Sequence, residues 1–158
     1  MNSPNYKQEA KASTTKTTFS RETTVSILIN ADAPTVWALL TNARDFPRWN
    51  STIVSLGGTI EEGEKIKLKS TLDERRTFVL RVKELTPNQR MVWSSAQGNR
   101  TYTLTETGNG TNFTMTEKIA SPFFPLFAKF IPPFDENFEQ FARDLQTEAT
   151  GSKNAHRK

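Results

Sequence analysis

Two charged side chains, Arg76 and Glu117, stand where the sequence pattern predicts residues that face the interior of a sheet. Arg76 has the same strand parity as Phe78, and Glu117 has the same parity as Met115. A buried charge is costly unless it is paired, so these side chains would pair with each other or orient a polar group of a bound molecule. The structural alternative is that each lies near a strand end, where a long side chain reaches water.

Tyr102 shares the inward parity and would add a hydroxyl group to the same interior. Such a hydroxyl can act as a hydrogen-bond donor or as a weak acid, although a buried tyrosine is more often a core residue with a satisfied tip. Glu117 would then be a candidate general base, with Tyr102 and Arg76 beside it.

The composition excludes several other kinds of chemistry. The 158 residues contain no cysteine, so disulfides, thiolate metal sites and cysteine nucleophiles are ruled out. The single histidine, His156, lies in a basic C-terminal tail, which argues against a histidine-based metal site or catalytic triad. We therefore expect no metal and no cofactor. The absence of strong catalytic groups argues against an enzyme but leaves this possibility open.

Strands dominate the middle of the chain, where apolar and polar residues alternate with a period of two. The first strand is predicted over residues 18–29. Asp32 and Pro34 then open a helix, because aspartate caps helix N-termini and proline fits the first turn. A second short helical turn is predicted at residues 45–50. About six antiparallel strands follow, with a hairpin at residues 108–110.

A stripe of phenylalanines marks the C-terminal part of the chain, where seven of the eleven lie within residues 123–141. From Phe127 to Leu145 the large apolar residues step by 3, 4, 4, 3 and 4, which is the spacing of one helix face. Such a face would cover the apolar side of the sheet. A curved sheet around a helix leaves a space of the kind in which small molecules commonly bind.

Two prolines divide this stripe between two helices. We predict a short helix over residues 121–131, a break at Pro132 and Pro133, and a main helix over residues 133–147. The short helix is apolar around most of its circumference, so it would be buried, act as a gate, or contact a membrane or a partner. Residues 123–127 are also a candidate patch for a weak homodimer.

The ends of the chain are polar, and we expect residues 1–17 and 150–158 to be flexible tails around a single domain at residues 18–149. The net charge of +4 comes with no nucleic-acid recognition motif, so we expect no nucleic-acid partner. No apolar stretch is long enough to cross a bilayer, and the N-terminus lacks the apolar core of a signal peptide. A cytoplasmic location is the default expectation.

Four motifs occur in an order that resembles a known family. They lie at residues 33–37 (APTVW), 45–50 (DFPRWN), 87–93 (PNQRMVW) and 108–111 (GNGT). In this order they are similar to the START-like helix-grip (SRPBCC) superfamily, and within it to the polyketide cyclase/dehydrase-type branch, over residues 20–148.

The resemblance implies an α+β helix-grip fold. In that fold a strongly curved antiparallel sheet of about seven strands wraps around a long C-terminal helix, with two short helices after the first strand. Members of the superfamily bind lipids, sterols, hormones or polyketides. Some assist chaperone ATPases, and a minority are cyclases or other enzymes, so the fold leaves the function open.

The leading hypothesis is a module that binds one small hydrophobic or amphipathic ligand between the sheet and the C-terminal helix. Strand parity, the helix face and the position of the second short helix at the entrance predict which residues line this site. They are Trp49, Leu68, Arg76, Phe78, Leu80, Trp93, Tyr102, Phe113, Met115, Glu117, Phe127, Phe130, Phe134 and Phe138. The structural alternative is that these side chains pack on one another as a closed core.

Two other classes of function remain open. An enzyme of the cyclase or dehydratase type would use the same cavity, with proton transfer by Glu117, Arg76 or Tyr102. A protein–protein adaptor, such as a chaperone ATPase activator, would instead use surface charge and the apolar segment at residues 123–131.

Overall fold

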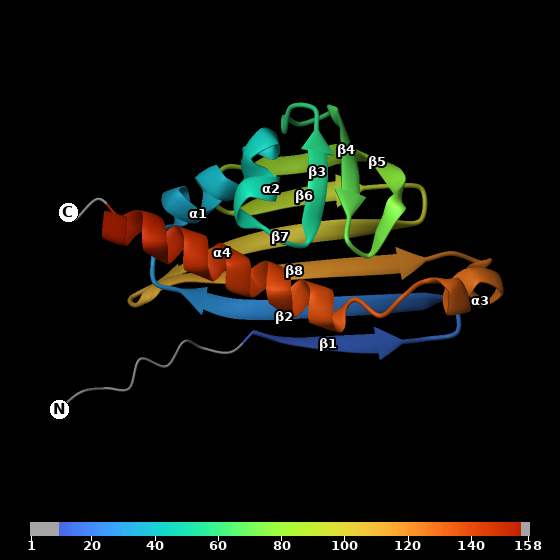
Figure 1. Cartoon of the computed structure of the whole chain (residues 1–158). Coiled ribbons are helices and arrows are strands. Elements are labelled where there is room, and N and C mark those ends of the chain that lie inside the picture. The colour runs from blue at the N-terminus through green and yellow to red at the C-terminus, as the bar shows by residue number, and fades with distance from the viewer. Residues whose placement is uncertain (1–9, 156–158) are drawn as a thin grey trace.

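Residues 10–155, which this computed structural model describes, contain eight strands that form one antiparallel sheet (Figure 1). The strands are β1 (Lys11–Lys16), β2 (Ser20–Ile29), β3 (Ile53–Gly57), β4 (Lys65–Ser70), β5 (Asp73–Thr86), β6 (Arg90–Ser94), β7 (Gly98–Thr107) and β8 (Gly110–Ala120). Their order across the sheet is β1-β2-β8-β7-β6-β5-β4-β3. The pairing of β2 with β8 therefore joins the beginning of the chain to the end of the meander.

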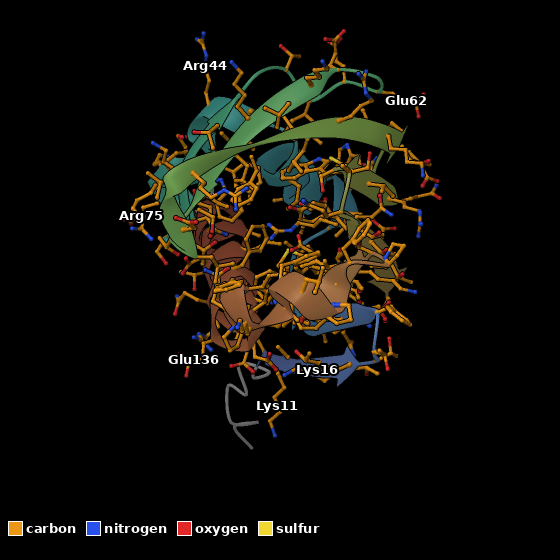
Figure 2. The ribbon with its side chains drawn as sticks, turned by 90° about the vertical axis from the view of Figure 1, so that its right-hand side faces the viewer. Lys11, Lys16, Arg44, Glu62, Arg75 and Glu136 are labelled. Carbon is orange, nitrogen blue, oxygen red and sulfur yellow. The ribbon has the colours of Figure 1, made fainter. Side chains whose placement is uncertain are left out.

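The sheet is strongly curved, with the concave side around the C-terminal helix. Figure 2 shows it arching from the blue strands β1 and β2 at the bottom to the green strands at the top. Register shifts interrupt the β3–β4, β4–β5 and β5–β6 pairs. Such irregularities bend strands and increase their twist, which accounts for the curvature of this half of the sheet.

The helices lie between β2 and β3 and after β8. They are α1 (Ala33–Leu40), the 3-10 turn η1 (Ala43–Asp45), α2 (Phe46–Trp49), α3 (Phe124–Phe127), the 3-10 turn η2 (Ala128–Phe130) and α4 (Asp135–Ala155). Asp32 caps α1 by accepting a hydrogen bond from the backbone N–H of Thr35 at 2.9 Å, and Pro34 lies in the first turn. The predicted cap, both short helices after the first long strand and the helix-grip arrangement are thus confirmed.

Helix α4 crosses the concave face of the sheet and supplies the centre of the core (Figure 1). Phe138, Phe141 and Leu145 on its inner face are fully buried. The ring of Phe141 lies 6.0 Å from that of Phe113 and 6.1 Å from that of Tyr102. A buried aromatic side chain of this size contributes several kcal/mol to folding, at about 25 cal/mol per Å² of buried apolar surface.

Hydrogen bonds hold α4 against both edges of the structure. At its N-terminal end, Asp135 accepts a hydrogen bond from the Thr14 hydroxyl at 2.6 Å, and Glu139 accepts one from the backbone N–H of Ala12 at 2.8 Å. Farther along, Asp144 accepts hydrogen bonds from both the backbone N–H and the hydroxyl of Ser51, each at 2.7 Å. The position of the helix is therefore set by polar contacts as well as by its aromatic face.

The structure corrects several expected boundaries. Residues 11–16 were placed in a flexible tail but form β1, which pairs with β2 and raises the expected seven strands to eight. The strand is held by its backbone pairing with β2 and by hydrogen bonds to α4. Its side chains therefore need not alternate between apolar and polar, and the sequence pattern does not indicate a strand there. Helix α4 extends to Ala155, beyond the expected end of the domain at residue 149. The remaining tail residues, 1–9 and 156–158, lie outside the described part of the chain.

The β7–β8 hairpin, which the Gly-Asn-Gly motif predicted, requires glycine at position 110. Gly110 has a φ of 139°, and a Cβ there would lie too close to the carbonyl oxygen of Ile29. A Cβ at Gly108, two residues earlier in the same hairpin, would meet nothing within 4 Å.

We therefore predict that Gly110→Ala lowers the free energy of unfolding by roughly 1–3 kcal/mol or more, through backbone strain and the steric conflict. The measurement is urea unfolding followed by circular dichroism, with Gly108→Ala as the matched control. Equal stability of the two variants would contradict this account of the hairpin.

Candidate ligand-binding cavity

The curved sheet and the segment that leads into α4 enclose a cavity of about 410 Å³. Its walls come from β4 to β8, from α3 and η2, and from the first residues before α4. It lies at the end of the molecule where α3 is seen at the right of Figure 1, and this end faces the viewer in Figure 2. Its size is within the range of small-molecule sites, about 300–1,000 Å³.

Nine of the fourteen residues expected at a binding site line this cavity. They are Leu68, Arg76, Phe78, Leu80, Trp93, Glu117, Phe127, Phe130 and Phe134. Strand parity brought the sheet residues together, since the alternate positions on β4 and β5 face outward, as the exposed Val79 illustrates. Phe130 differs from expectation because its side chain is 74% exposed, so it lies at the rim rather than in the core.

The other five, Trp49, Tyr102, Phe113, Met115 and Phe138, do not line the cavity but are buried in the core beside it. The reason is the depth to which α4 enters the concave face. Phe141 fills the space in front of Tyr102 and Phe113, and its ring lies 6.1 Å from that of Trp49. This cavity therefore includes only part of the expected set, because α4 closes the interior over the rest of its length.

Glu117 forms an ion pair with Arg100 and not with Arg76, so of the alternatives left open for Arg76 the one that holds is a side chain that reaches water. Nε of Arg100 donates a hydrogen bond to Oε1 of Glu117 at 2.8 Å, and the two side chains are only 7% and 19% exposed. Arg76 instead reaches the rim, where its guanidinium lies 5.0 Å from the ring centre of Phe78. Arg100 has the same strand parity as Tyr102, which was expected to face inward. The sequence pattern could therefore have predicted that Arg100 also faces inward.

Two buried arginines border the inner part of the cavity. Burial lowers the pKa of Arg100, but Glu117 and Tyr102 outweigh this effect and the pKa ends above its usual value. Arg21 has a pKa lowered by burial, and its guanidinium donates hydrogen bonds to the carbonyl oxygens of Ile131 at 3.2 Å and Pro132 at 2.8 Å. Arg21 thus fixes the turn between η2 and α4, which forms one wall of the cavity.

The turn between β6 and β7 contributes further lining residues that the sequence did not indicate. Ser95, Gln97, Gly98 and Asn99 lie there, and Ile119 on β8 also joins the wall. Ile119 lies two residues after Glu117 on the same strand, so strand parity could have predicted that it faces inward. The turn residues give no periodic signal, because a turn has no face that alternates.

The apolar segment around α3 lies beside the mouth of the cavity. Phe124 is buried, whereas Phe123 and Leu126 are exposed and Phe127 is half-buried against the cavity. The segment is therefore anchored on one side and presents apolar side chains to solvent on the other. Its expected role as a homodimer patch stays a prediction.

A second hollow, of about 610 Å³, lies between α4 and the segments that precede β3 and follow β4. It is an open groove lined mainly by polar side chains, among them Ser51, Asn137 and Arg143. Such a surface has little apolar area to bury, so the cavity inside the grip is the better candidate site. Within residues 10–155, no cluster of three histidine, aspartate or glutamate side chains could hold a metal ion.

The curved antiparallel sheet around the long C-terminal helix defines a helix-grip fold. The family described as polyketide cyclase/dehydrase and lipid transport matches residues 20–150, and the chain belongs to this family. The resemblance predicted from the four motifs is thereby confirmed. No curated protein matches the chain significantly.

Solved structures share the fold at low sequence identity. A protein from Rhodobacter sphaeroides has a TM-score of 0.64 and 18% identity, and the match covers 89% of this chain and 99% of that one. A START superfamily protein from Mycobacterium smegmatis has a TM-score of 0.58 and 15% identity, over 84% and 98% of the two chains. DynU16, described as a putative protein in the dynemicin biosynthetic locus, has a TM-score of 0.63 and 19% identity, over 81% and 47%.

The buried ion pair leads to a prediction about stability. Arg100→Met should lower the free energy of unfolding by about 3 kcal/mol, because Glu117 would keep an unpaired and largely buried charge. The double variant Arg100→Met/Glu117→Gln should recover most of this loss. Arg76→Met, which removes the same charge at the exposed rim, should change stability by no more than about 0.5 kcal/mol. Urea unfolding of the four proteins is the measurement, and equal effects at positions 100 and 76 would refute the assignment.

The buried tyrosine leads to a prediction about alkaline pH. Burial raises the pKa of Tyr102 to about 12, so its hydroxyl is neutral at physiological pH. An unfolded chain loses the Tyr102 proton near pH 10, whereas the folded protein keeps it until about pH 12. The free energy of unfolding therefore falls as the pH rises from 10 to 12. The loss should be about 2–3 kcal/mol, at roughly 1.4 kcal/mol per pKa unit.

Tyrosinate absorbance at 295 nm should therefore show one ionisation delayed to about pH 12. The chain has a second tyrosine, Tyr6, so Tyr102→Phe serves as the control and should remove the late step alone. A late step that persists in Tyr102→Phe would show that the delayed group is another one.

Proposed function

We propose that the protein binds one small hydrophobic or amphipathic molecule in the cavity between the sheet and the segment that leads into α4. The observation that carries this proposal is the cavity of about 410 Å³ with walls of large apolar side chains. Leu68, Phe78 and Leu80 form its sheet side, and Phe127 faces them from α3. A ligand that covers these walls gains roughly 25 cal/mol for each Å² of apolar surface removed from water.

The shape of the cavity supports one ligand that enters from the side of α3. Its inner limit is the aromatic core around Phe138, and its rim includes the exposed Arg76, Asn99 and Phe130. The rim is therefore partly polar and partly apolar. The family description includes lipid transport, which is the same class of ligand.

Two tryptophan substitutions on β5 test the proposal. Leu80→Trp fills the cavity, whereas Val79→Trp adds the same side chain on the opposite face of the strand, where the native residue is 52% exposed. We expect the protein to bind the neutral fluorophore N-phenyl-1-naphthylamine, and Leu80→Trp to weaken binding about tenfold or more through loss of space. Val79→Trp should bind like the native chain.

Fluorescence titration gives the affinities, and circular dichroism checks that both variants are folded. Native mass spectrometry followed by organic extraction would identify any molecule that the purified protein already carries. Failure of the native chain to bind the fluorophore, or equal binding by both variants, would place the site elsewhere or remove it.

A second candidate function, an enzyme of the cyclase or dehydratase type, is favoured by the carboxylate of Glu117 in the cavity wall. Glu117 would accept a proton from a substrate, and Arg100 beside it would stabilise the negative charge that forms on the substrate. The discriminating experiment offers a poly-β-ketone to the native chain and to Glu117→Gln. Turnover by the former alone would support the enzyme, and binding without turnover would leave the carrier function.

A further inference from the structure

The inner wall of the cavity carries a row of polar side chains across three neighbouring strands. Trp93 on β6 is paired in register with Arg100 on β7, and Arg100 is paired with Glu117 on β8. Residues directly opposite one another on adjacent strands project to the same face, and all three line the cavity. Tyr102 stands two residues along β7, with its ring 4.9 Å from that of Trp93.

This row has more hydrogen-bond donors than acceptors. Nε of Arg100 donates to Glu117, and no hydrogen bond from its two Nη atoms is found among the described residues. Likewise, within residues 10–155, the buried Nε1 of Trp93 and hydroxyl of Tyr102 have no hydrogen-bond partner. Arg100 lies close enough to Tyr102 that their interaction raises the pKa of Arg100 and opposes the effect of burial on the pKa of Tyr102.

Unpartnered donors of this kind are uncommon in folded proteins. Buried polar groups nearly always have a partner, because a buried donor without one loses its bonds to water and gains none. Of these three side chains, Trp93 and Arg100 line the inner end of the apolar cavity, whereas Tyr102 is buried in the core behind it. The donors of Trp93 and Arg100 call for a group that only accepts hydrogen bonds.

Two positively and two negatively charged side chains lie near this end of the cavity. Arg100 and Arg21 carry positive charge, and Glu117 and Asp135 carry negative charge, with Asp135 acting on Arg21. The two Nη atoms of Arg21 already donate hydrogen bonds to the carbonyl oxygens of Ile131 and Pro132. The available cationic donors therefore belong to Arg100, whose planar fork matches the two oxygens of a carboxylate.

We infer that the ligand is a carboxylate with an apolar body, and that its head lies inward against Arg100, beside Trp93. The apolar body extends outward between Phe78, Leu80 and Phe127 toward the rim. This inference rests on the proposed function, since it names the class of ligand for the same cavity. It makes Arg100 the residue that determines specificity.

The test compares a C18 polyene fatty acid, whose fluorescence rises in apolar surroundings, with its methyl ester at pH 7.5. The native chain should bind the acid about tenfold or more tightly than the ester, because the ester cannot form charge-assisted bonds to Arg100. Arg100→Met/Glu117→Gln, which removes the ion pair as a unit, should bind both probes alike.

Arg76→Met is the matched control for the loss of an arginine at the rim, and it should keep the preference for the acid. If the preference disappears in Arg76→Met and persists in the double variant, the head faces outward and the inference is overturned. Equal binding of acid and ester by the native chain also overturns it while leaving the proposed function intact. If N-phenyl-1-naphthylamine binds but neither C18 probe does, the carboxylate inference fails alone, and if nothing binds, both fail.

Discussion

The depth to which the aromatic face of α4 enters the curved sheet governs the rest of the structure. Phe141 lies at the centre of this contact, with the rings of Phe46, Trp49, Tyr102 and Phe113 at 6.0–6.1 Å from its own. These rings fill the grip around the middle of the helix, so the interior is solid there. Open space remains where the chain has not yet entered α4, and this is why the cavity lies at the α3 end of the molecule.

The break at Pro132 and Pro133 creates that open end. A continuous helix would have carried Phe127 and Phe130 along the same face as Phe138, and the phenylalanine stripe would have packed down its whole length. Proline removes a backbone donor and stops the helix, and Arg21 holds the carbonyl groups of this turn. Phe127 and Phe130 therefore line the cavity and its rim instead of the core.

The same arrangement places an ion pair beside an apolar space. Arg100 and Glu117 form an ion pair at 2.8 Å, although both side chains are largely shielded from water. Replacing such a pair with apolar residues is often neutral or stabilising in proteins, so stability alone does not explain its presence. The proposed role in orienting a ligand would explain it, and the description of the family to which the chain belongs covers both lipid transport and enzymes.

The sequence by itself determined the α+β class, the cap of α1, the β7–β8 hairpin and the inward set of strand residues, because each depends on a local pattern or on parity. Only the tertiary structure decided that Leu80 lines a cavity while Phe113 is core, since parity assigns a face and says nothing of how closely α4 approaches it. The partner of Glu117 was also settled in three dimensions, because Arg76 and Arg100 share its inward parity and only the register of β7 with β8 distinguishes them. Strand β1 escaped prediction for a related reason: backbone hydrogen bonds to β2 hold it, and they leave no trace in the types of its side chains.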